Sequence, residues 1–582
     1  MGAGLLGRSD APHHGGAPLV KAKPKKRTAS KPKAAKKKTH ALKRTVKKPV
    51  RSAKSTARKP ATRLKMKSKK NARPLKKGAA RKAPAKKQVK AAKRPNRARE
   101  REKAREALVQ RLATGSASEE AERKPIPKYP ILPWADSEGV RILLPHLRDA
   151  VRKCAITDWR VNFAHTRSAN LYLGNDLSLE DDQRSIREDI LLTVYRRFDD
   201  GTMGEAQVPV STTDADTIRA EIARAADLAG VTRKTAYDLP EPVEGLHFPN
   251  GHDHGVLEAF QNGDGGRVPR RVLDELRAQL APIRDVRLAN AEVLTSASAV
   301  RVINSRGVDV SFYRTALLLD LTFLARNKMD EQEFHWMVDV VSPDQFDLRS
   351  TVPREAQRAR DALAAVPCAG FTGGVLLAGE ALRDYITPSN AANPVVMHAY
   401  ARLKTMGLSR LTPGSRIGEF KGDPFTLSSN PHIPLGALSI PVDEEGTPLR
   451  PLDIVRLGTF QQWIAGPRYA RELGVPVTGN VANVQVGAGA TREDYLRGNR
   501  YLEIVSFSWF NPDVVSGDYS AEIRLGYLWE NGRATPFRGG HLVGNVFADL
   551  CDARLSREVM QASRYYGPRA ILLRSGNVTR NG

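Results

Sequence analysis

The sequence predicts an α+β fold preceded by a disordered basic tail, and three observations carry this prediction. Positive charge is concentrated in the first 125 residues, helical and extended patterns alternate from residue 143 to residue 229, and short strands with Gly/Pro turns predominate beyond residue 425. We expect a disordered arm over residues 1–125, an N-terminal α/β domain with antiparallel hairpins and helices over 135–295, and a C-terminal, mostly antiparallel β domain over 296–582.

The arm is distinguished by its charge. Residues 1–125 hold 42 Lys and Arg against 7 Asp and Glu, whereas the rest of the chain holds 52 against 56. The formal net charge of +31 therefore belongs to the arm, and the body is slightly acidic. Lys, Ala and Pro dominate the arm, and its apolar residues are too sparse to offset the entropy of ordering the backbone.

The body, of about 450 residues, exceeds what one hydrophobic core usually serves, which indicates two domains. The chain's three cysteines, Cys154, Cys368 and Cys551, are far apart and form no CxxC pair. Neither a disulfide framework nor a thiolate zinc site is therefore expected. No run approaches the apolar length of a membrane span, and the first residues do not form a secretory signal. We expect a soluble, cytoplasmic protein.

The first half of the body predicts hairpins and helices in turn. Residues 189–197 and a second extended piece through Val208 and Val210 flank an Asp199-Asp200-Gly201 turn and are expected to form a hairpin. A helix that Thr212, Thr213 or Asp214 can cap then follows and ends at Gly230. Residues 240–267 are rich in Gly, Pro, His and Asp, which predicts a long loop, and a short helix is expected over residues 272–280.

The second half of the body is predicted to be mainly β. A hairpin is expected across Asn304-Ser305-Arg306-Gly307, because alternating apolar residues flank this turn. Helices are predicted over residues 353–366, where Pro353 suits the first turn, and over residues 380–386. The clearest strand alternates from Tyr519 to Tyr527 and is closed by an Asn-Gly turn.

Five segments of the body resemble a known family in their order and spacing. They are NSRGVDVSFYRTALLLDLTF (304–323), FTGGVLLAGEALRDYI (371–386), GEFKGDPFTL (418–427), VTGNVANVQVGAGA (477–490) and SGDYSAEIRLGYLWENGRATPFRGGHLVGN (516–545). The chain is identified from these segments as a member of the TldD/PmbA family, which is metallopeptidase-related. The resemblance runs from about residue 140 to residue 582, and it is looser in the hairpin and Ala-rich helix of residues 189–230.

This resemblance implies one of two kinds of subunit. The TldD kind is a zinc metallopeptidase with an H-E-x-x-x-H helix and a later Cys ligand, and its TldE/PmbA partner lacks both. If His398 matches the first ligand here, Ala399 replaces the Glu and Leu403 replaces the second His. Gly567-Pro568-Arg569 stands where the ligand Cys is expected. The chain therefore resembles the zinc-less kind more closely, and we expect neither a metal nor another cofactor.

Two polar turns are candidates for contacting a peptide, because Gly beside Asn or Asp lets a backbone approach and short polar side chains then present hydrogen bonds. The same residues are also suited to tight β turns without any ligand. The candidate residues are Gly479, Asn480, Gly517, Asp518, Ser520 and Asn545.

Two histidine-containing segments are candidate metal sites. His252-Asp253-His254 alternates two ligands on a predicted loop, but a third ligand is not visible at a useful spacing. His398 is expected to be a structural histidine on its helix. No phosphate-binding loop or nucleophile motif is visible in the body, so no catalytic residue is assigned.

The arm itself predicts non-specific binding to nucleic acid. Its Lys clusters would neutralise phosphates, and the arm has no aromatic residue before Tyr129 on which bases could stack. A solubilising spacer or a tether to another anionic surface would have the same composition. The predicted contacts are Lys36, Lys37, Lys38, Lys69, Lys70, Lys76, Lys77, Lys86 and Lys87.

Two hypotheses of function follow. In the first, the body is a zinc-less subunit that assists peptide proteolysis, either as a homodimer or in a heterodimer with a zinc-bearing TldD-like relative. In the second, the protein binds nucleic acid through its arm, and the peptidase-like fold serves as a non-catalytic scaffold. A cytoplasmic location, with association to the nucleoid through the arm, is compatible with both.

Overall fold

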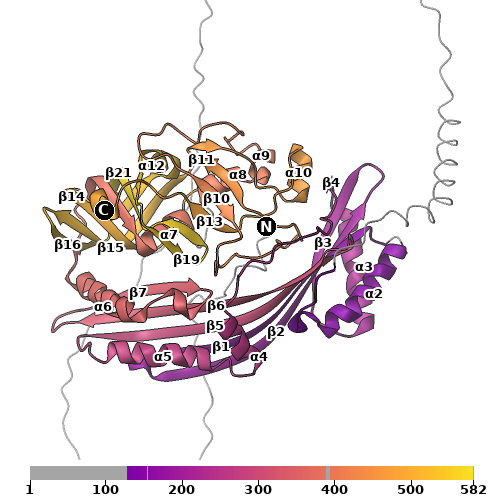
Figure 1. Cartoon of the computed structure of the whole chain (residues 1–582), viewed down its shortest axis with the longest axis horizontal. Coiled ribbons are helices and arrows are strands. Elements are labelled where there is room, and N and C mark those ends of the chain that lie inside the picture. Colours follow the sequence, from indigo (N-terminus) through magenta and orange to yellow (C-terminus); the bar gives the residue numbers. More distant parts are fainter. Residues whose placement is uncertain (1–127, 154, 389–392, 581–582) are drawn as a thin grey trace, which may run out of the picture. The chain divides into compact units, whose positions relative to one another are not determined.

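A computed structural model describes residues 128–153, 155–388 and 393–580 (Figure 1). The predicted arm and its nine candidate lysines lie outside the described residues. The described residues belong to one compact unit, and the predicted α+β class is confirmed. None of the helices within the described ranges is long and apolar enough to cross a membrane.

The first half of the body is built on a seven-stranded sheet in the order β4-β3-β2-β1-β5-β6-β7. Its neighbouring strands all pair antiparallel. Its strands are β1 (Asp158–Leu173), β2 (Leu179–Arg197), β3 (Thr202–Val210), β4 (Lys234–Thr235), β5 (Val286–Asn304), β6 (Asp309–Arg326) and β7 (Glu331–Val340).

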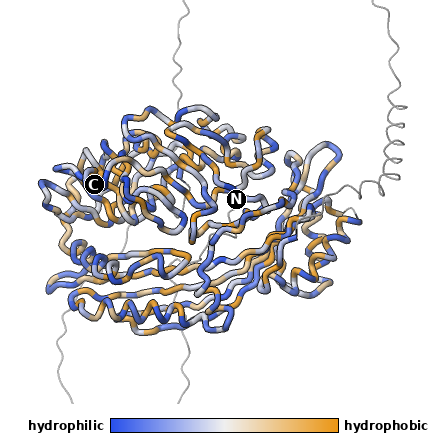
Figure 2. The backbone as a smooth tube through the Cα atoms, in the orientation of Figure 1, coloured by the Kyte–Doolittle hydropathy of each residue, from blue (hydrophilic) through white to orange (hydrophobic). Residues whose placement is uncertain are grey.

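Both predicted hairpins of this sheet are confirmed. β2 and β3 pair around the turn that contains Gly201, and β5 and β6 pair around the turn at Gly307. Residues alternate in hydropathy along the long strands, as Figure 2 shows. β5 begins at Val286, well before the predicted strand, and the domain boundary predicted at residues 295 and 296 lies inside it.

Five helices cover one face of this sheet. At one end, α2 (Glu138–Arg152) and α3 (Ala215–Val231) share a core with β1 to β3. Farther along the face, α4 (His254–Gln261), α5 (Arg267–Leu280) and α6 (Leu348–Ala364) pack on β5 to β7 (Figure 1).

Two predictions about these helices are wrong. Residues 240–267 are not wholly a loop, because the Asp253 side chain accepts a hydrogen bond from Val256 N–H and starts α4. Pro353 does not lie in the first turn of its helix, because Asp347 caps α6 and places the helix start at Leu348.

The second half of the body contains two further sheets. One has eight strands, and an additional pairing of β14 with β15 closes five of them, β14-β9-β21-β17-β15, into a barrel. Its strands are β8 (Val366–Pro367), β9 (Phe371–Ala378), β14 (Arg500–Phe507), β15 (Asp518–Glu530), β16 (Arg533–Arg538), β17 (His541–Asn545), β18 (Arg554–Leu555) and β21 (Ala570–Thr579).

The other sheet has six strands in the order β12-β11-β10-β13-β20-β19. They are β10 (Leu427–Asn430), β11 (Leu452–Arg456), β12 (Thr459–Phe460), β13 (Asn483–Val486), β19 (Val559–Ala562) and β20 (Tyr565–Pro568). Short helices connect the strands of this half: α7 (Gly379–Ile386), α8 (Pro394–Ala399), α9 (Ala401–Thr405), α10 (Pro467–Leu473), α11 (Glu493–Leu496) and α12 (Val546–Asp552). A single hydrophobic cluster joins both sheets.

The free face of the first sheet is turned toward the second half of the body. Even-numbered residues of β1 and β6 on this face hydrogen-bond to the second half: Asn162 Nδ2 donates to the Glu444 carbonyl at 2.7 Å, and Arg314 donates to the Ala437 carbonyl at 3.1 Å. Apolar contacts accompany these bonds, with Val302 and Phe312 sharing a small core with Val442.

Candidate peptide-contacting site

The two predicted polar turns lie on either side of the segment that holds α8. His398 on α8 hydrogen-bonds to the Val515 carbonyl, just before the Gly517 turn. Tyr400, which follows α8, accepts a hydrogen bond from Val481 N–H, just after the Asn480 turn, at 3.4 Å. Segments far apart in the sequence thus meet at residues 393–400.

His398 uses both of its ring nitrogens within the protein. Nε2 lies 2.8 Å from the Val515 carbonyl oxygen, and Nδ1 accepts the Arg410 N–H at 3.2 Å. The ring packs edge-on against Phe547, and the residue is 1% exposed. Burial lowers the pKa of His398. A neutral imidazole that donates from Nε2 and accepts at Nδ1 satisfies this geometry, as predicted for a structural histidine.

The expected helix over residues 395–403 is interrupted. Tyr400 has extended backbone angles (φ −70°, ψ 127°) that separate α8 from α9, and it forms a β-bridge with Ile464. Ala399 and Leu403 are both buried, and Ala399 belongs to the hydrophobic core of this half. This segment therefore presents no pair of ligand side chains on a continuous helical face, which an H-E-x-x-x-H site needs.

The Gly517 turn is held by hydrogen bonds of its own. Gly517 has φ +86°, and a Cβ there would lie 2.8 Å from the Phe547 ring, so glycine is required. Asn545 caps α12 by accepting N–H groups of Phe547 and Ala548, and its Nδ2 donates to Asp518 at 2.8 Å. That bond is the main cause that lowers the pKa of Asp518. Asn545 is thus fully occupied, whereas Asp518 is exposed.

Ser520 is the most available of the predicted residues. It is exposed on β15, and its Oγ lies 3.4 Å from Nδ1 of His541 on the neighbouring strand β17. This distance marks a loose contact, which a ligand could replace at little cost.

The Asn480 turn is bound to an acidic turn at residues 443–445. Gly479 has φ +75° and packs against Asp443, while Asn480 donates from N–H to Asp443 Oδ2 at 3.0 Å and from Nδ2 to Glu444 at 2.7 Å. Asp443 also accepts the N–H groups of Glu445 and Thr447. Burial raises the pKa of Asp443 to about 7. Gly479 and Asn480 are therefore committed to this junction.

The acidic turn continues into contacts with the first sheet that the sequence did not predict. Glu445 lies 3.6 Å from the guanidinium of Arg160 on β1. Arg160 is 6% exposed and donates from Nε to Asn162 at 3.1 Å. Burial raises the pKa of Glu445. An ion pair between buried Arg160 and half-buried Glu445, together with the Asn162 bond, thus connects the two halves of the body at this point.

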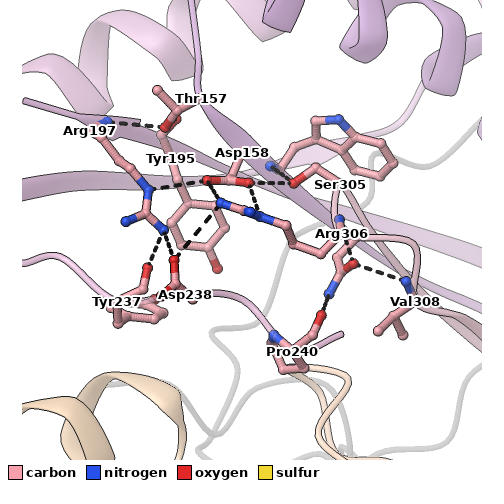
Figure 3. Close-up of polar contacts among 12 residues, drawn as sticks. Thr157, Asp158, Tyr195, Arg197, Tyr237, Asp238, Pro240, Ser305, Arg306 and Val308 are labelled. Atoms are coloured by element: carbon pink, nitrogen blue, oxygen red, sulfur yellow. Dashed lines mark hydrogen bonds and ion pairs between the residues drawn. The ribbon is translucent and has the colours of Figure 1, made fainter. Parts of the chain in front are cut away.

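A second polar network supports the same end of the first sheet (Figure 3). Buried Asp158 accepts hydrogen bonds from Ser305 Oγ and Arg306 Nε, both at 2.9 Å, and forms an ion pair with Arg197 at 3.4 Å. Asn304 Nδ2 donates to the Pro240 carbonyl at 2.8 Å. The NSRG turn, which contributed to the family resemblance, therefore anchors the start of β1 and residues 237–240.

A buried carboxyl group lies behind the Gly517 turn. Tyr519 donates its hydroxyl proton to Asp549 at 2.6 Å, and Tyr385 approaches the same carboxylate at 3.5 Å. Burial raises the pKa of Asp549 to about 6. Alternating apolar residues predicted the strand that carries Tyr519, but its hydrogen-bond partner comes from α12, outside any local pattern.

The His252-Asp253-His254 segment lies apart from this region, at the start of α4, whereas Cys551 lies on α12. Asp253 caps α4 and accepts from Ser342, and the His252 and His254 rings pack edge to face at 4.7 Å. Cys551 is buried, and burial raises the pKa of its thiol. Across the part of the chain that the structure describes, no three His, Cys, Asp or Glu side chains are grouped so that they could hold a metal ion.

Comparison with known proteins identifies the C-terminal segment. Residues 392–579 match the PmbA/TldA metallopeptidase C-terminal domain. Over 115 residues, the chain is 30% identical to the metalloprotease PmbA of Escherichia coli O157:H7, a match that covers 19% of this chain and 25% of that protein. Over 334 residues, it is 22% identical to an uncharacterised protein of Methanocaldococcus jannaschii, covering 53% of this chain and 76% of that protein.

The fold is shared with a solved structure. TldE from Thermococcus kodakarensis superposes with a TM-score of 0.61 at 16% sequence identity, covering 75% of this chain and all of that one. The matched domain, the sequence relatives and the common fold lead to the same conclusion as the five segments first noted in the sequence. The chain belongs to the TldD/PmbA family.

Proposed function

We propose that this chain is a zinc-less subunit that assists peptide proteolysis by a zinc-bearing relative. The observation that carries this proposal is the bonding of His398, whose two ring nitrogens are engaged by Val515 and Arg410. The residues at the remaining family positions, Ala399 and Leu403, are apolar and buried. This set does not fit a zinc ion, so no catalytic step is assigned to it.

In this proposal the chain contributes a surface for the peptide. The polar face of the first sheet is a suitable wall, because half-buried Thr166, Ser168 and Asn170 of β1 lie beside Ser296 and Ser298 of β5. Short hydroxyl and amide side chains can bond to a peptide backbone without selecting one sequence. Ser520 and Asp518 are the predicted contacts that remain exposed in the second half of the body.

A cleavage assay tests this function. The full chain alone is expected to leave a fluorogenic peptide library intact, and a zinc-bearing relative purified from the same cells is expected to cleave it faster when this chain is added. An inactive variant of the relative, with its Glu base replaced by Gln, is the control for contaminating protease. Cleavage by this chain alone, or no effect on the relative, would contradict the proposal.

A second function is favoured by the charge of residues 1–125, which hold 42 Lys and Arg against 7 Asp and Glu. In this alternative the arm binds nucleic acid through phosphate contacts and brings a non-catalytic body to the nucleoid. Binding should then weaken by orders of magnitude between about 50 and 200 mM salt. Residues 126–582 alone should lose retention on a DNA column at low salt, and unchanged retention would remove this alternative.

A further inference from the structure

Strand β2 carries a long free edge. It pairs with β1 along its whole length, from Leu179 opposite Leu173 to Tyr195 opposite Asp158. On its other side β3 pairs only with Ile190 to Arg197, and no strand in the described part of the chain pairs there with residues 179–189. These residues are exposed or, at Asp182 and Asp189, half-buried. Free edges of this length are normally paired or covered.

We propose that a second copy of this chain pairs antiparallel with this edge, across a two-fold axis centred on Gln183. Such an axis stands perpendicular to the sheet and midway between the two strands, so opposed residues point to the same face. One residue of the strand must therefore lie directly opposite its own copy, and this residue is called the centre. The centre cannot lie beyond residue 184. If it did, Leu179 would stand opposite residue 191 or later, where β3 already occupies the edge.

Charge then selects among the remaining centres. A centre at residue 181 or 182 opposes an Asp to its own copy, and a centre at Arg184 opposes two guanidinium groups and also Glu180 to Glu188. Like charges directly opposite one another destabilise a strand pair. A centre at Gln183 creates no like-charged pair. Its regular pairs are Gln183 with Gln183, Asp182 with Arg184 and Asp181 with Ser185; a register shift in β2 at Glu180 interrupts the alternation, and Leu179 lies across from Arg187 beyond it.

The side chains at this edge are already held near the required positions. Asp182 accepts from Arg270 at 2.7 Å, which fixes its carboxylate on the helix-covered face of β2. The Arg184 guanidinium rests on Gly266, where a Cβ would lie 2.0 Å from it. Arg184 also lies 3.5 Å from Asp182 of its own chain, so the two pairs between copies, one on each side of the axis, would extend this existing contact into a four-membered network.

A hollow beside the edge would also be covered by the second copy. Its volume is about 280 Å³, and Arg167, Arg184, Ile186 and Phe260 are among its lining residues. Ile186 is 67% exposed at its mouth. In this register residue 180 of the second copy stands beside Ile186 and would cover part of its exposed side chain.

Charge exchange in the full chain tests the proposed interface. Wild-type protein is expected to sediment as a dimer. Arg184→Asp and Asp182→Arg each oppose like charges twice, so each variant alone should associate at least about tenfold more weakly. An equimolar mixture restores both attractive pairs and should form a dimer again. Arg187→Asp, which faces Leu179 in this register, is the matched control and should remain dimeric.

Disulfide trapping tests the register even if one of these variants fails to fold. Directly opposed strand residues have Cα atoms about 4.5–5.5 Å apart, within disulfide range. Gln183→Cys should therefore cross-link to itself under mild oxidation. Ser185→Cys lies on the same face but about 13 Å from its own copy, and it should not. The wild-type chain, oxidised in the same way, is the control for cross-links formed by its native cysteines.

Three results would overturn this interface: wild-type protein that is monomeric, charge variants that associate as tightly as wild type, or Ser185→Cys cross-linking as efficiently as Gln183→Cys. A monomer whose β2 amides become protected from hydrogen exchange only when a zinc-bearing relative is added would assign the edge to that relative instead. The interface does not depend on the zinc-less function, since none of these measurements involves zinc or peptide cleavage.

Discussion

Replacing Glu445 by Gln should destabilise the body by leaving the buried Arg160 side chain without its half-buried counter-charge. Arg160 is 6% exposed, and its guanidinium lies 3.6 Å from a Glu445 side chain that is 25% exposed. Removing one member of a fully buried pair costs about 3–5 kcal/mol. The partial exposure of Glu445 and the long contact reduce this loss to about 2–4 kcal/mol.

The effect is measurable as a change in melting temperature. Unfolding entropy of about 2.1 cal/mol/K per residue, summed over about 450 residues, converts this loss into a decrease of about 2–4 °C. Differential scanning fluorimetry of wild type and Glu445→Gln at pH 7 gives this value directly. The matched control is Glu530→Gln, which breaks the pair with Arg500 whose side chains are 58% and 52% exposed. That substitution should change stability by at most about 1 kcal/mol.

A double variant separates burial of charge from loss of packing. Arg160→Met with Glu445→Leu removes both charges, and it should recover at least half of the stability that Glu445→Gln loses, because apolar replacement of a buried pair is often neutral. The reasoning would be refuted if Glu445→Gln were no more destabilising than Glu530→Gln. It would also be refuted if the double variant were less stable than Glu445→Gln by itself.

Three further perturbations follow from the site. Burial raises the pKa of Asp549 to about 6 from an ordinary value of 3.8, so folding favours the protonated carboxyl group. The contribution of this group to the free energy of unfolding is complete below about pH 4 and is lost as the pH rises through about 6. The melting temperature of wild type relative to Asp549→Asn should accordingly fall across this window, and a constant difference would contradict the assignment. His398→Leu leaves the Val515 carbonyl and the Arg410 N–H without their side-chain partner and should cost about 1–3 kcal/mol in chemical denaturation, without changing zinc content. A variant as stable as wild type would argue against the structural role. Asn545→Ala should lower stability by about 1 kcal/mol through loss of the α12 cap. Ser520→Ala should leave stability unchanged and weaken peptide binding measured by fluorescence anisotropy. If the two variants changed stability equally, the assignment of a structural role to Asn545 and a binding role to Ser520 would be wrong.

Local patterns were enough to predict several elements of this fold. The hairpins at Gly201 and Gly307 and the helix of residues 379–386 follow from turn chemistry and apolar spacing that lie within a few residues. The segment at residues 240–267 shows where such patterns fail. Its composition is typical of a loop, yet Asp253 caps a helix that buries Val256 and Phe260 against the sheet.

Elements fixed by distant contacts could not be predicted locally. Tyr400 interrupts an apolar run that otherwise reads as one helix, because Ala401 N–H bonds to the Ile464 carbonyl at 2.9 Å instead of continuing the helix. β5 starts at Val286 among small residues of weak strand propensity, and its pairing with β1 on one side and β6 on the other makes it a strand.

The candidate site shows the same division. Glycines with positive φ at residues 479 and 517 were correctly recognised as special positions, since only local backbone geometry is involved. The partners that occupy Asn480 and Asn545 come from an acidic turn and a helix cap elsewhere in the chain. Sequence alone therefore identified the turns but could not show that these two amides are already bound within the protein.

Zinc content of the purified full chain tests the central claim most directly. The protein is prepared without chelators, dialysed against buffer containing zinc and then against metal-free buffer, and measured by mass spectrometry of the elements. His398→Leu, treated in the same way, shows whether any retained zinc depends on that imidazole. The account predicts far less than one zinc per chain in both proteins. One tightly held zinc per wild-type chain that disappears in His398→Leu would contradict it.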